Sequence, residues 1–212
     1  MPIQNIKPED IEKESFRIIF AELGPHSFDA ATLSIVQRVI HATGDFSFAE
    51  NLHFSADAIV RGITALRQGK DILTDVTMVK AGISKAMFAR WHGAIRCGVD
   101  DPAVAAAAKR YQRTRSQVAM ERLLDESVGI VAIGNAPTAL LQIIDMLDGF
   151  APRKAPLVIG TPVGFVNAAE SKDLLIASGR CHIACRGRKG GSPVAAAIVN
   201  ALLRLAIQEE DR

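Results

Sequence analysis

The sequence predicts an α/β protein whose β-sheet is mostly parallel and covered by helices on both faces. The continuous apolar run at 128–133 is typical of a strand that is buried on both faces. From there to the C-terminus, short apolar runs alternate with segments of helix length, as they do in parallel sheets. No linker, repeat or low-complexity tract divides the chain, so we expect residues 1–212 to form a single domain.

The composition argues against several classes of protein. Hydrophobic residues make up 49% of the 212 residues and charged residues 23%, as in ordinary globular domains. A net charge of +2 and an aromatic content of 5% argue against a nucleic-acid partner. No apolar run approaches the ~20 residues that a membrane helix needs. Three cysteines and the lack of a signal-peptide pattern predict a cytoplasmic protein.

Two helices begin the chain, and we expect this segment, residues 8–42, to pack on the α/β core. Pro8 suits a first helical turn, and Gly24-Pro25 ends the helix that it starts. Ser27 or Asp29 caps the second helix, which runs to about residue 42. Apolar stripes mark the expected core faces, with Ile11, Ile18 and Ile19 in the first helix and Leu33, Val36 and Ile40 in the second.

Two polar side chains lie in or beside these stripes. Ser15 falls inside the first stripe, where a buried hydroxyl must find a partner, most often in the preceding helical turn. His41 lies at the edge of the second stripe, in the last helical turn, where the helix dipole favours a cation. Histidine titrates near neutral pH, so His41 is either a candidate acid–base group or a structural histidine.

The middle of the chain alternates short strands and helices less regularly. In chain order, we expect a helix from Ser55 or Asp57 to Gln68-Gly69, a strand at 71–75, a helix over 76–80, a strand at 94–98, an Ala-rich helix from Asp101-Pro102, and a helix over 114–126. Thr114 suits the cap of the last of these helices, and Arg115 follows it as either a surface charge or a ligand group.

The last third of the chain holds three strands, at 128–133, 157–159 and 181–186, and each is followed by a helix. These helices run to Leu147, over 168–177, and from 192 to about 207. Ligands of open α/β sheets bind where loops leave the carboxyl ends of the strands. The polar side chains after these strand ends are therefore candidate ligand groups, above all Asn135, Lys172, Arg186 and Arg188.

These junctions also have purely structural interpretations. Asn135 suits a helix N-cap, and 186–193 fits either a solvated basic turn or an anion site formed by glycines and a helix N-terminus. The spacing matches neither a Walker loop nor a dinucleotide-binding fingerprint. Cys181, His182 and Cys185 do not indicate a metal site, because on a strand the histidine points away from two cysteines that lie roughly 13 Å apart.

Several segments together resemble the precorrin-8X methylmutase family of corrin (vitamin B12) biosynthesis, and the resemblance covers nearly the whole chain. The most specific match is 160–173, where Pro-Val-Gly-Phe-Val is followed by Ala-Glu-Ser-Lys. The other matching segments are 14–16, 18–19, 39–44, 72–75, 78–79, 114–116, 131–140 and 186–188. The region 86–98 matches less well, and no role is inferred from it.

The resemblance implies a flavodoxin-like, three-layer α/β/α fold and a homodimer that holds its tetrapyrrole near the subunit interface. It implies an isomerase that moves one methyl group from C11 to C12 of precorrin-8X or cobalt-precorrin-8, giving hydrogenobyrinate or cobyrinate. No cofactor, methyl donor or protein-bound metal is expected. The family's catalytic histidine corresponds to His41, and its substrate contacts correspond to Ser15, Ser84 and Arg115, although the family often has threonine at position 84.

Further residues suit a flat, mostly apolar ring that is fringed with carboxylates. We add Thr43, Asn135, Lys172, Arg186 and Arg188 to the expected substrate-binding residues, since basic side chains pair with carboxylates. Two other functions fit the same segments. One is a carrier that binds the tetrapyrrole without converting it. The other is a nucleotide-binding, flavodoxin-like enzyme, for which the phosphate-binding spacings are missing.

Overall fold

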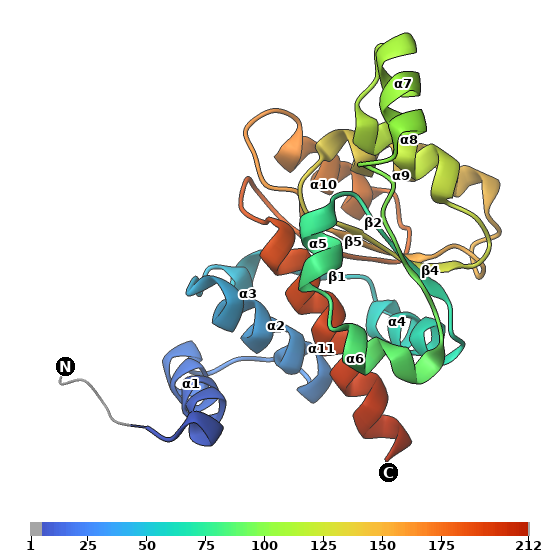
Figure 1. Ribbon diagram of the computed structural model, residues 1–212. Coiled ribbons are helices and arrows are strands. Elements are labelled where there is room, and N and C mark those ends of the chain that lie inside the picture. Colours follow the sequence, from blue (N-terminus) through green and yellow to red (C-terminus); the bar gives the residue numbers. More distant parts are fainter. Residues whose placement is uncertain (1–5, 212) are drawn as a thin grey trace.

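The computed structural model describes residues 6–211 and shows a β-sheet between two layers of helices (Figure 1). The strands are β1 (Leu52–Phe54), β2 (Asp71–Thr74), β3 (Ile95–Arg96), β4 (Val128–Ile133), β5 (Leu157–Gly160) and β6 (His182–Cys185). The helices are α1 (Pro8–Leu23), α2 (Ala30–Thr43), α3 (Phe48–Asn51), α4 (Ala58–Arg67), α5 (Thr77–Gly82), α6 (Lys85–Phe88), α7 (Pro102–Arg110), α8 (Arg115–Leu123), α9 (Pro137–Met146), α10 (Ala168–Ala177) and α11 (Ser192–Glu210). Two 3₁₀ turns lie at Ala89–Trp91 and Leu147–Gly149.

The order of the strands is β1-β6-β5-β4-β2-β3. Strand β1 is antiparallel to β6, and the other neighbouring strands are parallel. Counted along the chain, the parallel strands follow the order 2-1-3-4-5, which is the flavodoxin-like order. The predicted three-layer fold with a mostly parallel sheet is therefore confirmed. The order reverses between β2 and β4, so the carboxyl ends of these strands form the switch point at which such sheets bind ligands.

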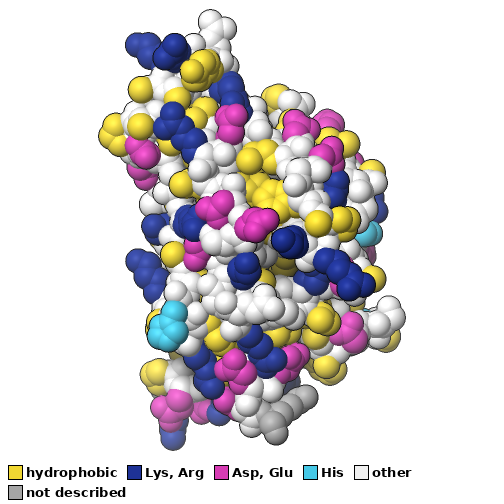
Figure 2. All heavy atoms as spheres, turned by 90° about the vertical axis from the view of Figure 1, so that its right-hand side faces the viewer, with side chains coloured by type: hydrophobic (Ala, Val, Ile, Leu, Met, Phe, Trp, Pro, Cys, Tyr) yellow, Lys and Arg dark blue, Asp and Glu magenta, His cyan; other side chains and the backbone are white. Residues whose placement is uncertain are grey.

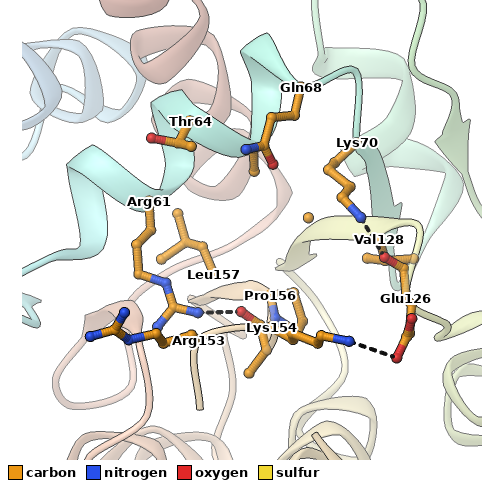
Figure 3. A pocket seen from close by; sticks show the side chains of 13 residues that line it. Arg61, Thr64, Gln68, Lys70, Glu126, Val128, Arg153, Lys154, Pro156 and Leu157 are labelled. Carbon is orange, nitrogen blue, oxygen red and sulfur yellow. Dashed lines mark hydrogen bonds and ion pairs between the residues drawn. The ribbon is translucent and has the colours of Figure 1, made fainter. Parts of the chain in front are cut away.

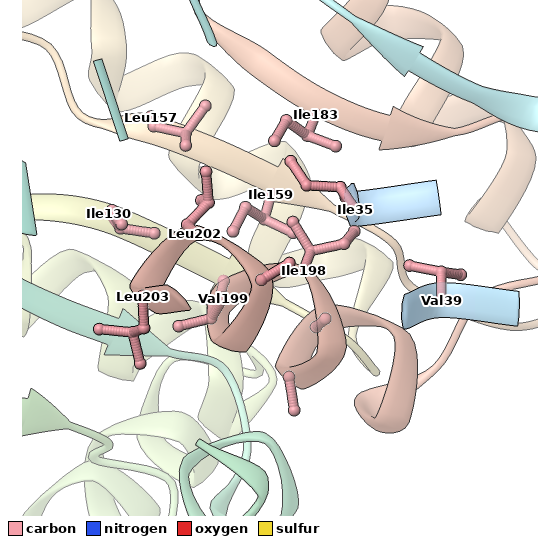
Figure 4. Packing of buried hydrophobic residues seen from close by; sticks show 14 of the residues in the cluster. Ile35, Val39, Ile130, Leu157, Ile159, Ile183, Ile198, Val199, Leu202 and Leu203 are labelled. Carbon is pink, nitrogen blue, oxygen red and sulfur yellow. The ribbon is translucent and has the colours of Figure 1, made fainter. Parts of the chain in front are cut away.

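Alternate residues of the strands enter two separate cores. In β4, Ile130 and Ala132 face the layer of α2, α4 and α11, while Val131 and Ile133 face the layer of α8, α9 and α10. Figure 4 shows the first core, where side chains from the sheet, α2 and α11 meet: Ile35, Val39, Ile130, Leu157, Ile159, Ile183, Ile198, Val199, Leu202 and Leu203. Burial on both faces explains why the central strands are continuous apolar runs.

Local capping signals placed several helix ends correctly. The Asp29 carboxylate accepts hydrogen bonds from the backbone N–H groups of Ala31 and Thr32, both at 2.9 Å, and starts α2. Thr114 and Gln117 form a reciprocal capping box at the start of α8. Within residues 6–211, no helix combines the length and the apolar character that a membrane span requires.

Two features differ from the sequence predictions. Strand β1 and the short helices α3 and α6 were not predicted, because segments of three or four residues carry too little periodicity to recognise. The stripe predicted for the first helix is only partly buried, since Ile19 is covered while Ile11 and Ile18 are 52% and 39% exposed. Helix α1 packs mainly against α2 and not against the sheet, so a full core-facing stripe is not required.

The antiparallel edge of the sheet contains a pair of stacked histidines. The His53 Nδ1 and His182 Nε2 atoms lie 2.8 Å apart, and His182 Nδ1 lies 2.7 Å from the carbonyl oxygen of Arg180. Because a carbonyl can only accept, His182 Nδ1 carries the proton, and His182 Nε2 accepts from His53. Burial lowers the pKa of both histidines, and the nearby Arg186 lowers them further.

This pair predicts a loss of stability at acidic pH. In the unfolded chain these histidines take up protons near the ordinary histidine pKa of about 6.5, whereas in the folded chain they take up protons only at lower pH. The free energy of unfolding should therefore hold its full value above about pH 6.5 and fall below it, by up to about 1.4 kcal/mol per pH unit for each proton. Urea denaturation between pH 5 and 8 measures this slope. His182→Gln should flatten it, and His26→Gln, at an exposed position, should not.

Candidate active site

One buried carboxylate joins the carboxyl ends of β2 and β4. Asp75, which directly follows β2, accepts hydrogen bonds from the backbone N–H groups of Gly134 (3.0 Å), Asn135 (2.8 Å) and Ala136 (2.7 Å), the residues that follow β4. The side chain is fully buried. Burial raises the pKa of Asp75, and the three N–H groups act against that rise. Asp75 therefore fixes the turn at the switch point of the sheet.

Two of the predicted substrate-binding residues lie at this edge. The Thr114 and Thr138 hydroxyls, 2.9 Å apart, join the N-termini of α8 and α9. Arg115 begins α8, and Asn135 precedes α9 by two residues, so the structure brings these two exposed side chains to neighbouring helix starts. Asn135 is not the N-cap of α9, because that position falls on Ala136. The backbone N–H of Asn135 instead donates a hydrogen bond to the Asp75 carboxylate, which holds Asn135 in the turn.

The loops after β5 and β6 lie against each other beyond the same edge. Their backbones are joined from Gly191 N–H to the Thr161 carbonyl (2.8 Å) and from Gly164 N–H to the Arg188 carbonyl (3.1 Å). Gly190 has a φ of +152°, and a Cβ there would collide with the Thr161 carbonyl. The loop after β5 exposes Phe165 by 83%, with the Arg188 guanidinium 5.4 Å from its ring centre. This edge therefore presents both apolar and cationic groups.

Arg186 and Lys172 have different surroundings. Arg186 is exposed and lies 4.0 Å from the Asp173 carboxylate. Lys172 is fully buried, and its Nζ donates a 2.7 Å hydrogen bond to the carbonyl oxygen of Lys189. Burial lowers the pKa of Lys172. The Lys172 amine thus supports the loop after β6 from inside the protein, which sequence patterns alone did not indicate.

The same loop is also tied to the end of α2. Lys189 Nζ donates to the Asp45 carboxylate at 2.6 Å and to the Ser47 hydroxyl at 2.9 Å. These contacts, with the Lys189 hydrogen bond first, lower the pKa of Asp45 to about 2. The Thr43 hydroxyl donates to the Val39 carbonyl (2.8 Å) and accepts from Asp45 N–H (3.2 Å). Thr43 therefore helps to shape the end of the helix that carries His41.

A pocket of about 480 Å³ between α2, α6 and α11 brings two of the predicted residues together, His41 and Ser84. The other side chains that line it are Arg38, Ala42, Met87, Ala197, Asn200 and Arg204. The Ser84 N–H donates to Asn200 Oδ1, and Asn200 Nδ2 donates to the Gly82 carbonyl, both at 2.8 Å. Asn200 therefore positions the turn that holds Ser84 against α11.

His41 is exposed at the pocket and has an aromatic neighbour from α1. The Phe16 ring lies 5.2 Å from the His41 ring, measured between centres, with a tilt of 33°. Ser15, beside Phe16, donates its hydroxyl proton to the Ile11 carbonyl at 2.8 Å, the local bond to the preceding turn that its position suggested. The geometry leaves the His41 imidazole accessible to a ligand for proton transfer, with an aromatic ring against it.

A second cavity, of about 420 Å³, lies at the opposite edge of the sheet, before β4 and β5 (Figure 3). Its basic side chains are largely engaged: Arg61 donates to the Ala155 carbonyl (2.5 Å), Lys70 donates to the Glu126 carbonyl (2.7 Å), and Lys154 pairs with the Glu126 carboxylate (3.8 Å). None of the predicted site residues lines it. On the face shown in Figure 2, basic and acidic side chains are interspersed, which fits the small net charge.

Sequence reasoning missed four residues that shape the site: Asp75, Arg38, Asn200 and Arg204. Three of them carried a usable signal. Arg38 precedes His41 by three residues, and Asn200 precedes Arg204 by four, so each pair shares one helix face. The partners of Asp75 lie about sixty residues further along the chain, so only the sheet topology reveals its role.

Comparisons with known proteins show which family and which fold this chain is similar to. The precorrin-8X methylmutase family model matches residues 10–205. A cobalt-precorrin-8 methylmutase of Priestia megaterium is 45% identical over 203 residues, which cover 95% of this chain and 89% of that protein. A precorrin-8X methylmutase of Pseudomonas aeruginosa is 42% identical and covers 91% of this chain and 93% of its own length. The crystal structure of the precorrin-8X methylmutase from Thermus thermophilus superposes with a TM-score of 0.86, at 36% identity, over 95% of this chain and 97% of that one.

The Asp75 contacts predict the effect of removing its charge. Asp75→Asn turns an amide N–H₂ toward backbone N–H groups and leaves at least one buried donor unsatisfied, at a cost of about 1–3 kcal/mol. We expect a lower free energy of unfolding and faster amide exchange at residues 134–136. Asp145→Asn, at an exposed position on α9, is the matched control and should change neither. Unchanged exchange at these three amides in the folded Asp75→Asn variant would contradict the role of Asp75.

Proposed function

The chain belongs to the precorrin-8X methylmutase family, and we propose that it converts precorrin-8X or cobalt-precorrin-8 by moving a methyl group from C11 to C12. The activity is that of an isomerase in corrin biosynthesis. The observation that carries the proposal is the match over residues 10–205 together with an exposed histidine in a pocket, His41. The names of the relatives describe catalysts, so they favour an enzyme over a carrier.

In this proposal His41 is the acid that starts the reaction. It lies in the last turn of α2, and its exposed side chain lines the pocket. The imidazolium donates its proton to a ring nitrogen of the substrate, which draws electron density through the conjugated system. The bond from the methyl group to C11 breaks while the bond to C12 forms. The proton then returns to His41, so the reaction needs no oxidant, reductant or methyl donor.

Of the eight predicted substrate-binding residues, five bind the macrocycle in this proposal and three support the residues around it. The pocket holds His41 and Ser84 and is too small and open for a whole tetrapyrrole, so the ring extends beyond it. We propose that Arg115, Asn135, Arg186 and Arg188, all of which are exposed, bind the part of the ring that lies outside the pocket. Ser15, Thr43 and Lys172 act as supports, because their polar groups already bind the backbone.

The proposal includes a homodimer whose subunits meet near the site. Three neighbouring apolar side chains of the loop after β5 support it: Val163, Phe165 and Val166 are 45%, 83% and 78% exposed. Exposed apolar clusters of this kind mark surfaces that bind a partner or a ligand. We further propose that residues 1–212 form one domain, supported by the packing of α2 on α11, and that the protein works in the cytoplasm, supported by three free cysteines.

Replacing His41 tests the mechanism. His41→Ala should lower turnover by about 10²–10⁴-fold, the usual contribution of a positioned acid, while binding of the product is retained. The measurement is the change of the visible spectrum as precorrin-8X becomes a corrin, with circular dichroism to check the fold. His26→Ala, at an exposed position outside the pocket, should keep normal turnover. Near-normal conversion by a folded His41→Ala variant would refute the role.

A further inference from the structure

Two guanidinium groups line the pocket of His41, and neither belongs to the predicted site. Arg38 comes from α2 and Arg204 from α11. Both meet the same carboxylate oxygen: Glu12 Oε1, on α1, lies 3.2 Å from Arg38 Nη1 and 3.7 Å from Arg204 Nη2. Two cations therefore share one anion, and the group keeps a net positive charge beside the proposed acid.

The pKa shifts of Arg38 and Glu12 indicate that positive charge exceeds negative charge around Glu12, Arg38 and Arg204. Burial lowers the pKa of Arg38, and the neighbouring Arg204 lowers it further. The pKa of Glu12 is also lowered, first by the hydrogen bond from Arg38 and then by the charges of Arg204 and His41. Each positive group thus favours a nearby carboxylate, and only one is present among the described residues.

Arg204 is the less satisfied of the two. Within residues 6–211, its guanidinium makes only the 3.7 Å contact to Glu12, and its buried Nε has no hydrogen-bond partner. A buried donor without a partner is unfavourable. The Arg204 side chain is nevertheless 42% exposed, so a carboxylate that enters the pocket can pair with its Nη groups in the planar geometry that guanidinium groups prefer.

Glu12 is easily displaced from this position. Its side chain is 51% exposed, and exposed ion pairs contribute little to stability. Helix α1 buries a single residue, Ile19. On the side of α1 that faces the pocket, the Phe16 ring lies against both His41 and the Arg38 guanidinium. A substrate carboxylate can therefore replace Glu12 without unfolding any core element.

We propose that Arg38 and Arg204 bind one carboxylate side chain of the macrocycle and that Glu12 occupies this position in the free protein. The inference rests on the proposed function and specifies which residues orient the ring. With one acidic side chain held by this pair, the adjacent part of the ring lies against His41. The pair is thus a specificity determinant for acidic tetrapyrroles over their uncharged derivatives.

The competing explanation is structural, since Glu12, Arg38 and Arg204 also link α1, α2 and α11. The two explanations predict different ligand preferences. A purely structural link makes no distinction between a charged and an uncharged ligand. A carboxylate-binding pair favours the charged ligand, and the protein's preference for that ligand falls when one of the two guanidinium groups is removed.

The test measures binding of hydrogenobyrinate and of its fully amidated derivative by the full-length protein, by titration of the visible spectrum. Arg204→Met should weaken binding of the carboxylate form by about ten- to a hundredfold and leave the amidated form within about twofold. Glu12→Gln should tighten binding of the carboxylate form by up to about fivefold, because a competing anion is removed. The matched controls are Arg17→Met and Glu14→Gln, an ion pair on the same helix, and both should bind like the wild type.

Three outcomes are distinguished. A selective loss for the carboxylate form in Arg204→Met, with tighter binding in Glu12→Gln, supports the proposal. Equal losses for both ligands in Arg204→Met, or weaker binding in Glu12→Gln, would overturn it in favour of the structural link. Conversion of precorrin-8X by the wild type is measured in parallel. Absence of that conversion contradicts the proposed function itself, whereas normal conversion with unchanged preference in Arg204→Met contradicts only the inference.

Discussion

The packing of α11 against the sheet is the constraint on which the rest of the structure depends. This helix buries ten residues, and α2, α4 and α5 all pack on it. At Gly82 the approach is so close that a Cβ would lie 2.7 Å from the Cβ of Ala196. The turn after α5, which carries Ser84, is therefore held directly against α11. Because α11 also contributes Asn200 and Arg204, the pocket is formed by groups whose relative positions the hydrophobic core fixes.

Two polar connections link this pocket to the carboxyl edge of the sheet. On one side, Asp75 holds the turn after β4, and the chain continues from Asp75 through α5 to Ser84. On the other side, the buried Lys172 holds the Lys189 carbonyl, and the Lys189 amine holds Asp45 just beyond the helix of His41. Both connections use hydrogen bonds of charged groups, to backbone atoms for Asp75 and Lys172 and to the Asp45 carboxylate for Lys189, and such bonds are stronger than neutral hydrogen bonds. A ligand at the sheet edge and the histidine in the pocket are thus positioned by one continuous framework.

The sequence predicted the layers of the fold far better than the contacts of single side chains. Runs such as 128–133 reveal buried strands because both faces of the sheet are covered, and Asp29 or Thr114 reveal helix starts because caps are local. The burial of Lys172 was not predictable, since a lysine in the first turns of a helix is usually solvated and its partner lies 17 residues away. Asp75 was passed over for the same reason. Roles that depend on distant backbone atoms need the topology, while the family resemblance alone singled out His41 and Ser84, which line one pocket in the structure.

The charge arrangement of the pocket connects substrate recognition with proton transfer. The two guanidinium groups that line the pocket of His41 share a single carboxylate, that of Glu12. In the partly enclosed pocket, a substrate carboxylate held by Arg38 and Arg204 adds negative charge where solvent screening is weaker than at the surface. In this proposal the bound macrocycle itself supplies the negative charge that the two guanidinium groups lack. A substrate without this carboxylate would lose both the ion pair and the orientation of its ring against His41, so we infer that binding and catalysis select for the same chemical group.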